Sequence, residues 1–186
     1  MCLSYSDHNF IGGCFSGHIF TWDAASNASS PKATEAHNGA VMALCKQAND
    51  AGFITGGNDG KIIFWDPNID KKMLEFDLNI CSIKNMNSTK IRAIAEDSSK
   101  DVVIGTRGGE LIELRTDKGD NGFSLLVRGH YHKKVTGIAN IPNKGEFITC
   151  GQDRLLIIYE IGTRRFKESI QMMYSMTCID VTSDGK

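Results

Sequence analysis

Four thirteen-residue segments of this chain can be aligned without a gap, and they decide its fold: FIGGCFSGHIFTW (10–22), FITGGNDGKIIFW (53–65), VVIGTRGGELIEL (102–114) and FITCGQDRLLIIY (147–159). Their starts are separated by 43, 49 and 45 residues. Each segment has a short apolar or β-branched run, then glycine-rich turn residues, then a second β-branched run, which predicts two strands joined by a tight turn. Self-similarity at this period predicts an array of repeated β-sheet units.

A second repeated element lies eleven or twelve residues before each of the later three segments and recurs near the end of the chain. Its four copies are VMALC (41–45), IRAIA (91–95), VTGIA (135–139) and MTCID (176–180). The first three share an order of apolar, variable, small, apolar and small residues, and Asp180 breaks the last position of the fourth. Small side chains allow neighbouring sheets to approach closely, so this element is predicted to be the innermost strand of each unit.

The period and the turn residues resemble those of WD repeats, which recur every ~40–45 residues. Two segments also end in the Trp-Asp dipeptide, at Trp22-Asp23 and Trp65-Asp66. The resemblance implies an all-β WD-repeat β-propeller of about four blades, forming one array over residues 1–186. The blades are expected at approximately 1–25, 36–68, 78–116 and 128–162, with the start of another blade at 174–186.

The two ends of the array leave two interpretations open. By the spacing of the other units, the inner strand of the first blade would begin before residue 1, so we expect it to be missing. At the other end, residues 176–180 match an inner strand without partner strands. Either that strand completes the first blade and closes a small ring, or the chain is a fragment of a larger propeller. The fragment is favoured, because four blades is the lower limit for propellers.

In WD repeats a histidine before the inner strand joins a buried hydrogen-bonded set with a Ser or Thr, an Asp and the Trp of the same blade. The resemblance implies this structural network in one blade for His37, Thr55, Asp59 and Trp65. In another blade, with a tyrosine at the tryptophan position, it implies the network for His130, Thr149, Asp153 and Tyr159. The blade around residue 102 has Gly108 and Leu114 at the Asp and Trp positions and no histidine, so packing alone is expected to hold it.

Longer stretches resemble the echinoderm microtubule-associated protein-like family, whose blades carry a recurring I-R-x-[ILV] … [ILV]-x-G-T-[RK]-x-G-E-[ILV] pattern. The stretches that carry this resemblance are 12–22, 36–39, 90–94, 103–113, 126–130, 137–139 and 147–154. The chain departs from the family in lacking its hydrophobic motif and most of its blades, and in having Thr136 where a tryptophan is common. The resemblance implies a module that associates with microtubules or their partners.

The formal net charge is −1, so no global field attracts nucleic acid or a membrane. The first residues have no secretory signal pattern, and the longest strongly apolar stretch, 155–159, is far too short to span a bilayer. Six separated cysteines without a CxxC motif are expected to be reduced thiols, which indicates a cytoplasmic protein. Basic clusters are most simply solvated loops; the alternative is a weak partner-binding patch of Lys133, Lys134, Arg164 and Arg165.

No phosphate-binding loop, paired catalytic carboxylates or zinc motif is present, so we expect no enzyme, no catalytic, cofactor-binding or metal-binding residues, and no cofactor. Metal binding by the His130-Tyr131-His132 step is disfavoured, because His130 fits the blade network. The expected function is a non-enzymatic protein-binding scaffold associated with microtubules or the cytoskeleton, with tubulin among its candidate partners. The alternative is a generic WD-repeat adaptor in another multiprotein complex.

Overall fold

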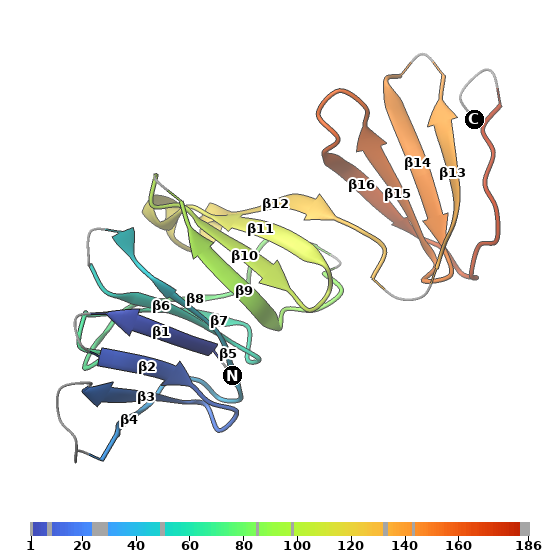
Figure 1. Ribbon diagram of the computed structural model, residues 1–186. Helices are drawn as coiled ribbons and strands as arrows, with labels where there is room; N and C mark the ends of the chain where they lie inside the picture. Colours follow the sequence, from blue (N-terminus) through green and yellow to red (C-terminus); the bar gives the residue numbers. More distant parts are fainter. Residues whose placement is uncertain are drawn as a thin grey trace. The chain divides into compact units, whose positions relative to one another are not determined.

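The protein is described by a computed structural model in which sixteen β-strands form four four-stranded antiparallel sheets (Figure 1). The described residues are 2–6, 9–23, 30–48, 51–84, 86–97, 99–131, 134–142 and 144–182. The chain divides into two compact units, residues 1–124 and 125–186. The prediction of an all-β propeller built from about four blades is confirmed, because each aligned segment forms the central strand pair of one sheet.

The first sheet has the order β1 (Cys2–Ser6), β2 (Asn9–Gly13), β3 (His18–Asp23) and β4 (Lys32–Glu35). The expectation that its inner strand is missing is therefore wrong. Strand β1 pairs with β2 along its full length, with Cys2 opposite Gly13. Only two residues separate β1 from β2, whereas six separate β5 from β6. The inner strand therefore fits into fewer residues than the spacing of the other units predicts.

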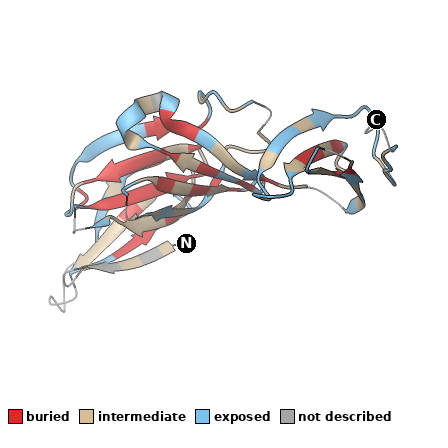
Figure 2. Ribbon diagram, turned by 90° about the horizontal axis from the view of Figure 1, so that it is seen from above, coloured by how far each residue is buried: buried red, intermediate tan, exposed pale blue. Residues whose placement is uncertain are grey.

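The second sheet consists of β5 (Val41–Lys46), β6 (Phe53–Gly57), β7 (Lys61–Trp65) and β8 (Lys72–Asp77). Every residue of β6 and all but the first of β7 are buried, as the burial colours of Figure 2 illustrate for the central strands. A strand covered on both faces is apolar throughout rather than alternating, which explains the sequences FITGG and KIIFW. The outer strand β8 exposes its first four residues.

The third sheet has the order β12 (Phe123–Arg128), β11 (Glu110–Leu114), β10 (Val102–Thr106) and β9 (Ile91–Glu96). A short 3-10 helix, η2 (Thr116–Gly122), connects β11 to β12. The fourth sheet consists of β13 (Val135–Ile141), β14 (Glu146–Gly151), β15 (Leu155–Glu160) and β16 (Phe166–Gln171).

Within the first unit, the inner strand β5 lies next to β1 on one side and next to β9 on the other. Glycine makes this approach tight at Gly56, where an added Cβ would lie 2.5 Å from Cδ1 of Ile94 and 2.6 Å from Cγ2 of Ile91. The main buried cluster joins the first two sheets and consists of Ile11, Ile19, Ala36, Val41, Phe53, Ile63, Trp65 and Ile69. A small residue of the second strand β6 therefore makes room for the large residues Ile91 and Ile94 of the neighbouring inner strand β9.

Residues 172–182 form no strand, but they dock on the fourth sheet in a way that the first sheet repeats. The amide of Met176 donates to the carbonyl of Gly151 at 3.2 Å, and the amide of Val41 donates to the carbonyl of Cys14, at the aligned position, at 2.9 Å. Ile179 and Val181 pack against the buried cluster of β13–β15. We propose that residues 176–181 are the inner strand of a further blade; residues 183–186 lie outside the described part.

Candidate functional site

The same turn closes the central strand pair of every sheet. In each turn the amide of the fourth residue donates to the carbonyl of the first, at 3.2–3.3 Å, over residues 14–17, 57–60, 106–109 and 151–154. The fourth residue has φ of +86°, +82° and +79° in the first three turns, where it is glycine, and +67° in the last, where it is Arg154. The four turns therefore share one backbone geometry, which positions the polar side chains described next.

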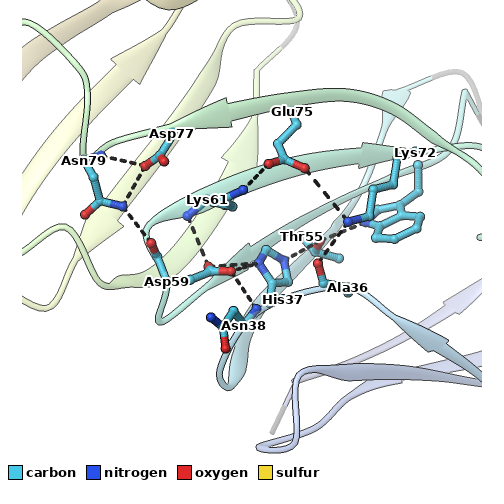
Figure 3. Close-up of polar contacts among 11 residues, drawn as sticks. Ala36, His37, Asn38, Thr55, Asp59, Lys61, Lys72, Glu75, Asp77 and Asn79 are labelled. Atoms are coloured by element: carbon cyan, nitrogen blue, oxygen red, sulfur yellow. Dashed lines mark hydrogen bonds and ion pairs between the residues drawn. The ribbon is translucent and has the colours of Figure 1, made fainter.

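In the second sheet the structure brings His37, Thr55, Asp59 and Trp65 together in one chain of hydrogen bonds (Figure 3). The His37 Nδ1 atom lies 3.0 Å from Oδ1 of Asp59, and its Nε2 atom lies 2.9 Å from Oγ1 of Thr55. The indole Nε1 of Trp65 donates to the same hydroxyl at 2.9 Å. The four side chains thus connect the loop before β5 to β6, β7 and the turn between them.

The donors in this chain fix the form of His37. The indole N–H can only donate, so the Thr55 hydroxyl accepts from it and donates its own proton to Nε2 of His37. The Nδ1 atom then carries the ring proton and donates it to Asp59. Burial acts to raise the pKa of Asp59, but the hydrogen bond and electrostatic attraction from the ring N–H of His37, together with the amides of Lys61 and Asn38, outweigh it and lower that pKa. The side chain of His37 has no exposed surface, and we propose that this set, called the clamp below, has a structural role.

A second, exposed layer of polar contacts surrounds the clamp (Figure 3). Lys61 pairs with Glu75, and Nζ of Lys72 lies 5.6 Å from the ring centre of Trp65. Asn79 donates to the carbonyl of Asp59 at 2.7 Å, which ties the end of β8 to the turn. Exposed pairs of this kind contribute little stability.

In the fourth sheet the structure brings together the four expected side chains, but the tyrosine has a different main partner from the tryptophan of the second sheet. The His130 Nδ1 atom lies 3.0 Å from both carboxylate oxygens of Asp153, and its Nε2 atom lies 2.9 Å from Oγ1 of Thr149. The Tyr159 hydroxyl donates to the carbonyl of Arg128 at 2.8 Å and also interacts with the Thr149 hydroxyl; burial raises its pKa, against the lowering effect of Thr149. The longer tyrosine side chain therefore also reaches the strand before the loop.

The expectation that packing alone holds the third sheet is wrong. Glu110, only 1% exposed, accepts a hydrogen bond from the hydroxyl of Thr106 and another from the amide of Asn87 at 2.6 Å. The Thr106 hydroxyl also accepts a hydrogen bond from the amide of Gly108 at 3.1 Å. Glu110 therefore links the loop before β9 to the turn between β10 and β11, as the His–Asp pair does in the second and fourth sheets. Its position on the same strand face as two buried residues, Ile112 and Leu114, is the signal in the sequence that could have found it.

The basic residues expected to form a patch do not gather at one place. Lys133 lies outside the described residues. Lys134 is exposed beside the turn at the start of β15, because its carbonyl accepts from the amide of Gln152 at 3.0 Å. Arg164 and Arg165 are exposed at the other end of β15, where the amide of Glu160 donates to the carbonyl of Arg165. At about 3.3 Å per residue, the six-residue strand separates these ends by about 17 Å.

Within the described ranges, no group of three or more His, Cys, Asp or Glu side chains could hold a metal ion. No helix in the described part of the chain has the length and apolarity needed to span a bilayer. His132, which the sequence places two residues after His130, lies outside the described residues.

Comparison with known proteins agrees with this geometry. The WD40 family (WD domain, G-beta repeat) matches residues 29–66 and 123–160. The WD40 β-propeller domain of Doa1 superposes with a TM-score of 0.51 at 22% identity, over 98% of this chain and 57% of that one. A chain of the mitotic checkpoint complex superposes with a TM-score of 0.52 at 18% identity, over 99% of this chain and 56% of that one. At these identities the structures show the fold alone.

Curated relatives extend the similarity to most of the chain. Echinoderm microtubule-associated protein-like 1 of Homo sapiens is 30% identical over 166 residues, which cover 88% of this chain and 19% of the relative. Echinoderm microtubule-associated protein-like 3 of Homo sapiens is 28% identical, over 96% of this chain and 20% of the relative. Echinoderm microtubule-associated protein-like 2 of Mus musculus is 25% identical, over 89% of this chain and 24% of the relative. The chain thus spans about a fifth to a quarter of the length of these relatives. It carries WD40 repeats and resembles the echinoderm microtubule-associated protein-like family.

Proposed function

We propose that this chain is a non-enzymatic protein-binding module that associates with microtubules in the cytoplasm. The observation that carries the proposal is the similarity to echinoderm microtubule-associated protein-like proteins, which covers 88–96% of the chain in three of them. The hydrogen-bonded sets around His37 and His130 support the proposal as well. They are buried and bonded to one another, so they hold the sheets and leave binding to the exposed turns and loops.

The exposed cations give microtubule binding two candidate surfaces on the fourth sheet. Arg165 lies after the end of β15 and lines a hollow with Lys144, Glu146, Glu160 and Lys167, and Arg164 is exposed beside it in the sequence. Lys134 lies at the opposite end. Because the net charge of the chain is only −1, attraction to an acidic lattice must come from such local clusters.

Co-sedimentation of the 186-residue chain with polymerised microtubules across a salt series tests the proposal. Pelleting that weakens as salt rises is expected, because exposed charge interactions are screened over about 8–10 Å at physiological salt. Charge reversal of Arg164 and Arg165 together, compared with reversal of Lys134 alone, then separates the two surfaces. A chain that stays in the supernatant at low salt would contradict the proposal.

The second candidate function is that of a WD-repeat adaptor in another multiprotein complex. The balanced charge and the paired cations Lys32, Lys61 and Lys167 favour it, because these residues already have carboxylate partners within the chain. Affinity capture with the wild-type chain, without microtubules, distinguishes the candidates: a stoichiometric complex free of tubulin would support the adaptor.

A further inference from the structure

One of the four equivalent turns breaks the rule that the other three follow. The left-handed backbone at its fourth position favours glycine, and Gly17, Gly60 and Gly109 occupy it in the first three sheets. In the fourth sheet that residue is Arg154, with φ of +67°. A non-glycine residue has a strained backbone in this region. Where the side chain makes no contact that stabilises the fold, such strain suggests a functional role for that side chain.

Nothing in the fold compensates for the strain at Arg154. A useful comparison is Ile69, which also has positive φ (+57°) but is fully buried in the core of the first two sheets. Arg154 is exposed, and its side chain has no hydrogen bond or ion pair with any residue in the described ranges. Only its backbone is used: the amide donates to Gly151 and the carbonyl accepts from Met172 at 2.8 Å.

That backbone carbonyl places a set of exposed apolar side chains beside the arginine. The carbonyl of Gln152 accepts from Oγ of Ser175 at 2.8 Å and that of Gly151 from the amide of Met176, so the loop after β16 is fixed on the turn at three points. Between Met172 and Ser175, Met173 is 81% exposed and Tyr174 is 78% exposed. On the other side of the turn, the amide of Gln152 donates a hydrogen bond to the backbone carbonyl of Lys134, whose side chain is exposed. We call Lys134, Arg154, Met172, Met173 and Tyr174 the Arg154 surface.

The charge of this surface is one-sided. Residues 170–176 contain no acidic residue. The single carboxylate of the turn, Asp153, has a side chain only 5% exposed and is bonded to His130. Arginine, tyrosine and methionine are the residue types enriched where proteins bind one another, and an arginine fork matches a carboxylate with two hydrogen bonds. A partner that fits must supply carboxylates beside an apolar or aromatic side chain.

We propose that the Arg154 surface is a binding site for an acidic protein segment that carries an apolar or aromatic anchor. Arg154 and Lys134 pair with the carboxylates of the segment, and Met173 and Tyr174 pack against its anchor. This inference goes beyond microtubule association, since any protein with such a segment satisfies it.

Binding of a fluorescein-labelled random copolymer of glutamate and tyrosine to the whole chain tests the site. Fluorescence anisotropy should show tighter binding of this copolymer than of polyglutamate, which has the charge without the ring. Arg154→Gly should weaken it roughly tenfold or more, as expected for a central arginine contact. The same substitution restores the residue found in the other turns, so the midpoint of thermal unfolding should stay level or rise.

A matched control separates this site from general charge. Lys100→Gly also removes an exposed cation at positive φ, of +67°, but outside the Arg154 surface, and it should leave binding unchanged. Tyr174→Ser should weaken binding without moving the unfolding midpoint. The proposal is overturned by absent copolymer binding, by an equal loss in the Lys100→Gly control, by an unchanged affinity of Arg154→Gly, or by tighter binding of single-stranded DNA. Copolymer binding without microtubule pelleting would support this site and contradict the proposed function.

Discussion

The two histidine networks differ in how many buried groups depend on the threonine hydroxyl, and this difference predicts unequal effects when each threonine is changed to valine. Thr55→Val preserves side-chain shape but removes the hydroxyl that lies 2.9 Å from both Nε2 of His37 and Nε1 of Trp65. Two buried polar groups lose their partner. Thr149→Val removes a hydroxyl that contacts the His130 ring and Tyr159, but Tyr159 keeps the carbonyl of Arg128 as its acceptor, so only His130 loses its partner.

The expected magnitudes follow from the number of groups left without a partner. An unsatisfied buried donor or acceptor costs about 1–3 kcal/mol, so Thr55→Val should lower the local free energy of unfolding by about 2–4 kcal/mol and Thr149→Val by about 1–2 kcal/mol. Because the two residues lie in different compact units, one global unfolding curve would mix their effects.

Hydrogen exchange read by mass spectrometry across a urea series measures each sheet separately. Peptides that cover β6 and β7 report on Thr55→Val, and peptides that cover β14 and β15 report on Thr149→Val. Thr55→Ser, which keeps the hydroxyl, should restore most of the protection lost in the valine variant. Equal losses for the two valine variants would refute the assignment of the indole N–H to Thr55.

Three further predictions concern single residues, each measured by chemical denaturation with exchange as the local readout. Glu110→Gln should destabilise the third sheet by about 1–3 kcal/mol, because the added amide protons face the donors that the carboxylate now satisfies; no loss would indicate that packing suffices. Asp59 has a lowered pKa, so its ionised form stabilises the fold above the ordinary value of about 3.9, and this contribution is lost as pH falls through the folded pKa. Asp59→Asn should therefore be less stable at pH 7 but lose less stability below about pH 4; parallel pH profiles would contradict this. Gly56→Ala should cost about 1–3 kcal/mol through overpacking, whereas Gly105→Ala, whose added Cβ finds its nearest neighbour at 3.6 Å, should be tolerated.

The strand pairs and turns were predictable because their signals are local. Gly57, Asn58, Asp59 and Gly60 carry turn chemistry within four residues, and β-branched runs flank them on both sides. The inner strand β1 was not predictable from the repeat spacing, since a two-residue connection to β2 replaces the longer loop of the other sheets. The repeat spacing therefore located the central strand pairs that all four sheets share, but it missed the inner strand of the first sheet, where the connection is shorter.

The functional residues were less accessible for physical reasons. Glu110 shares a strand face with two apolar residues, but its partner, the amide of Asn87, lies 23 residues earlier and could not be identified from the sequence. The significance of Arg154 depends on a backbone angle, which becomes visible only beside the three equivalent glycines. The four basic residues named from the sequence share a charge but not a location, because β15 separates Lys134 from Arg164 and Arg165.

The most direct test of the proposed function is to image the fluorescently labelled chain on immobilised microtubules and, under identical salt, on actin filaments. Both polymers are acidic, so charge alone predicts similar decoration of the two. Specific association with microtubules predicts decoration of microtubules that saturates, with little signal on actin. Equal decoration of both polymers, or of neither, would contradict the account.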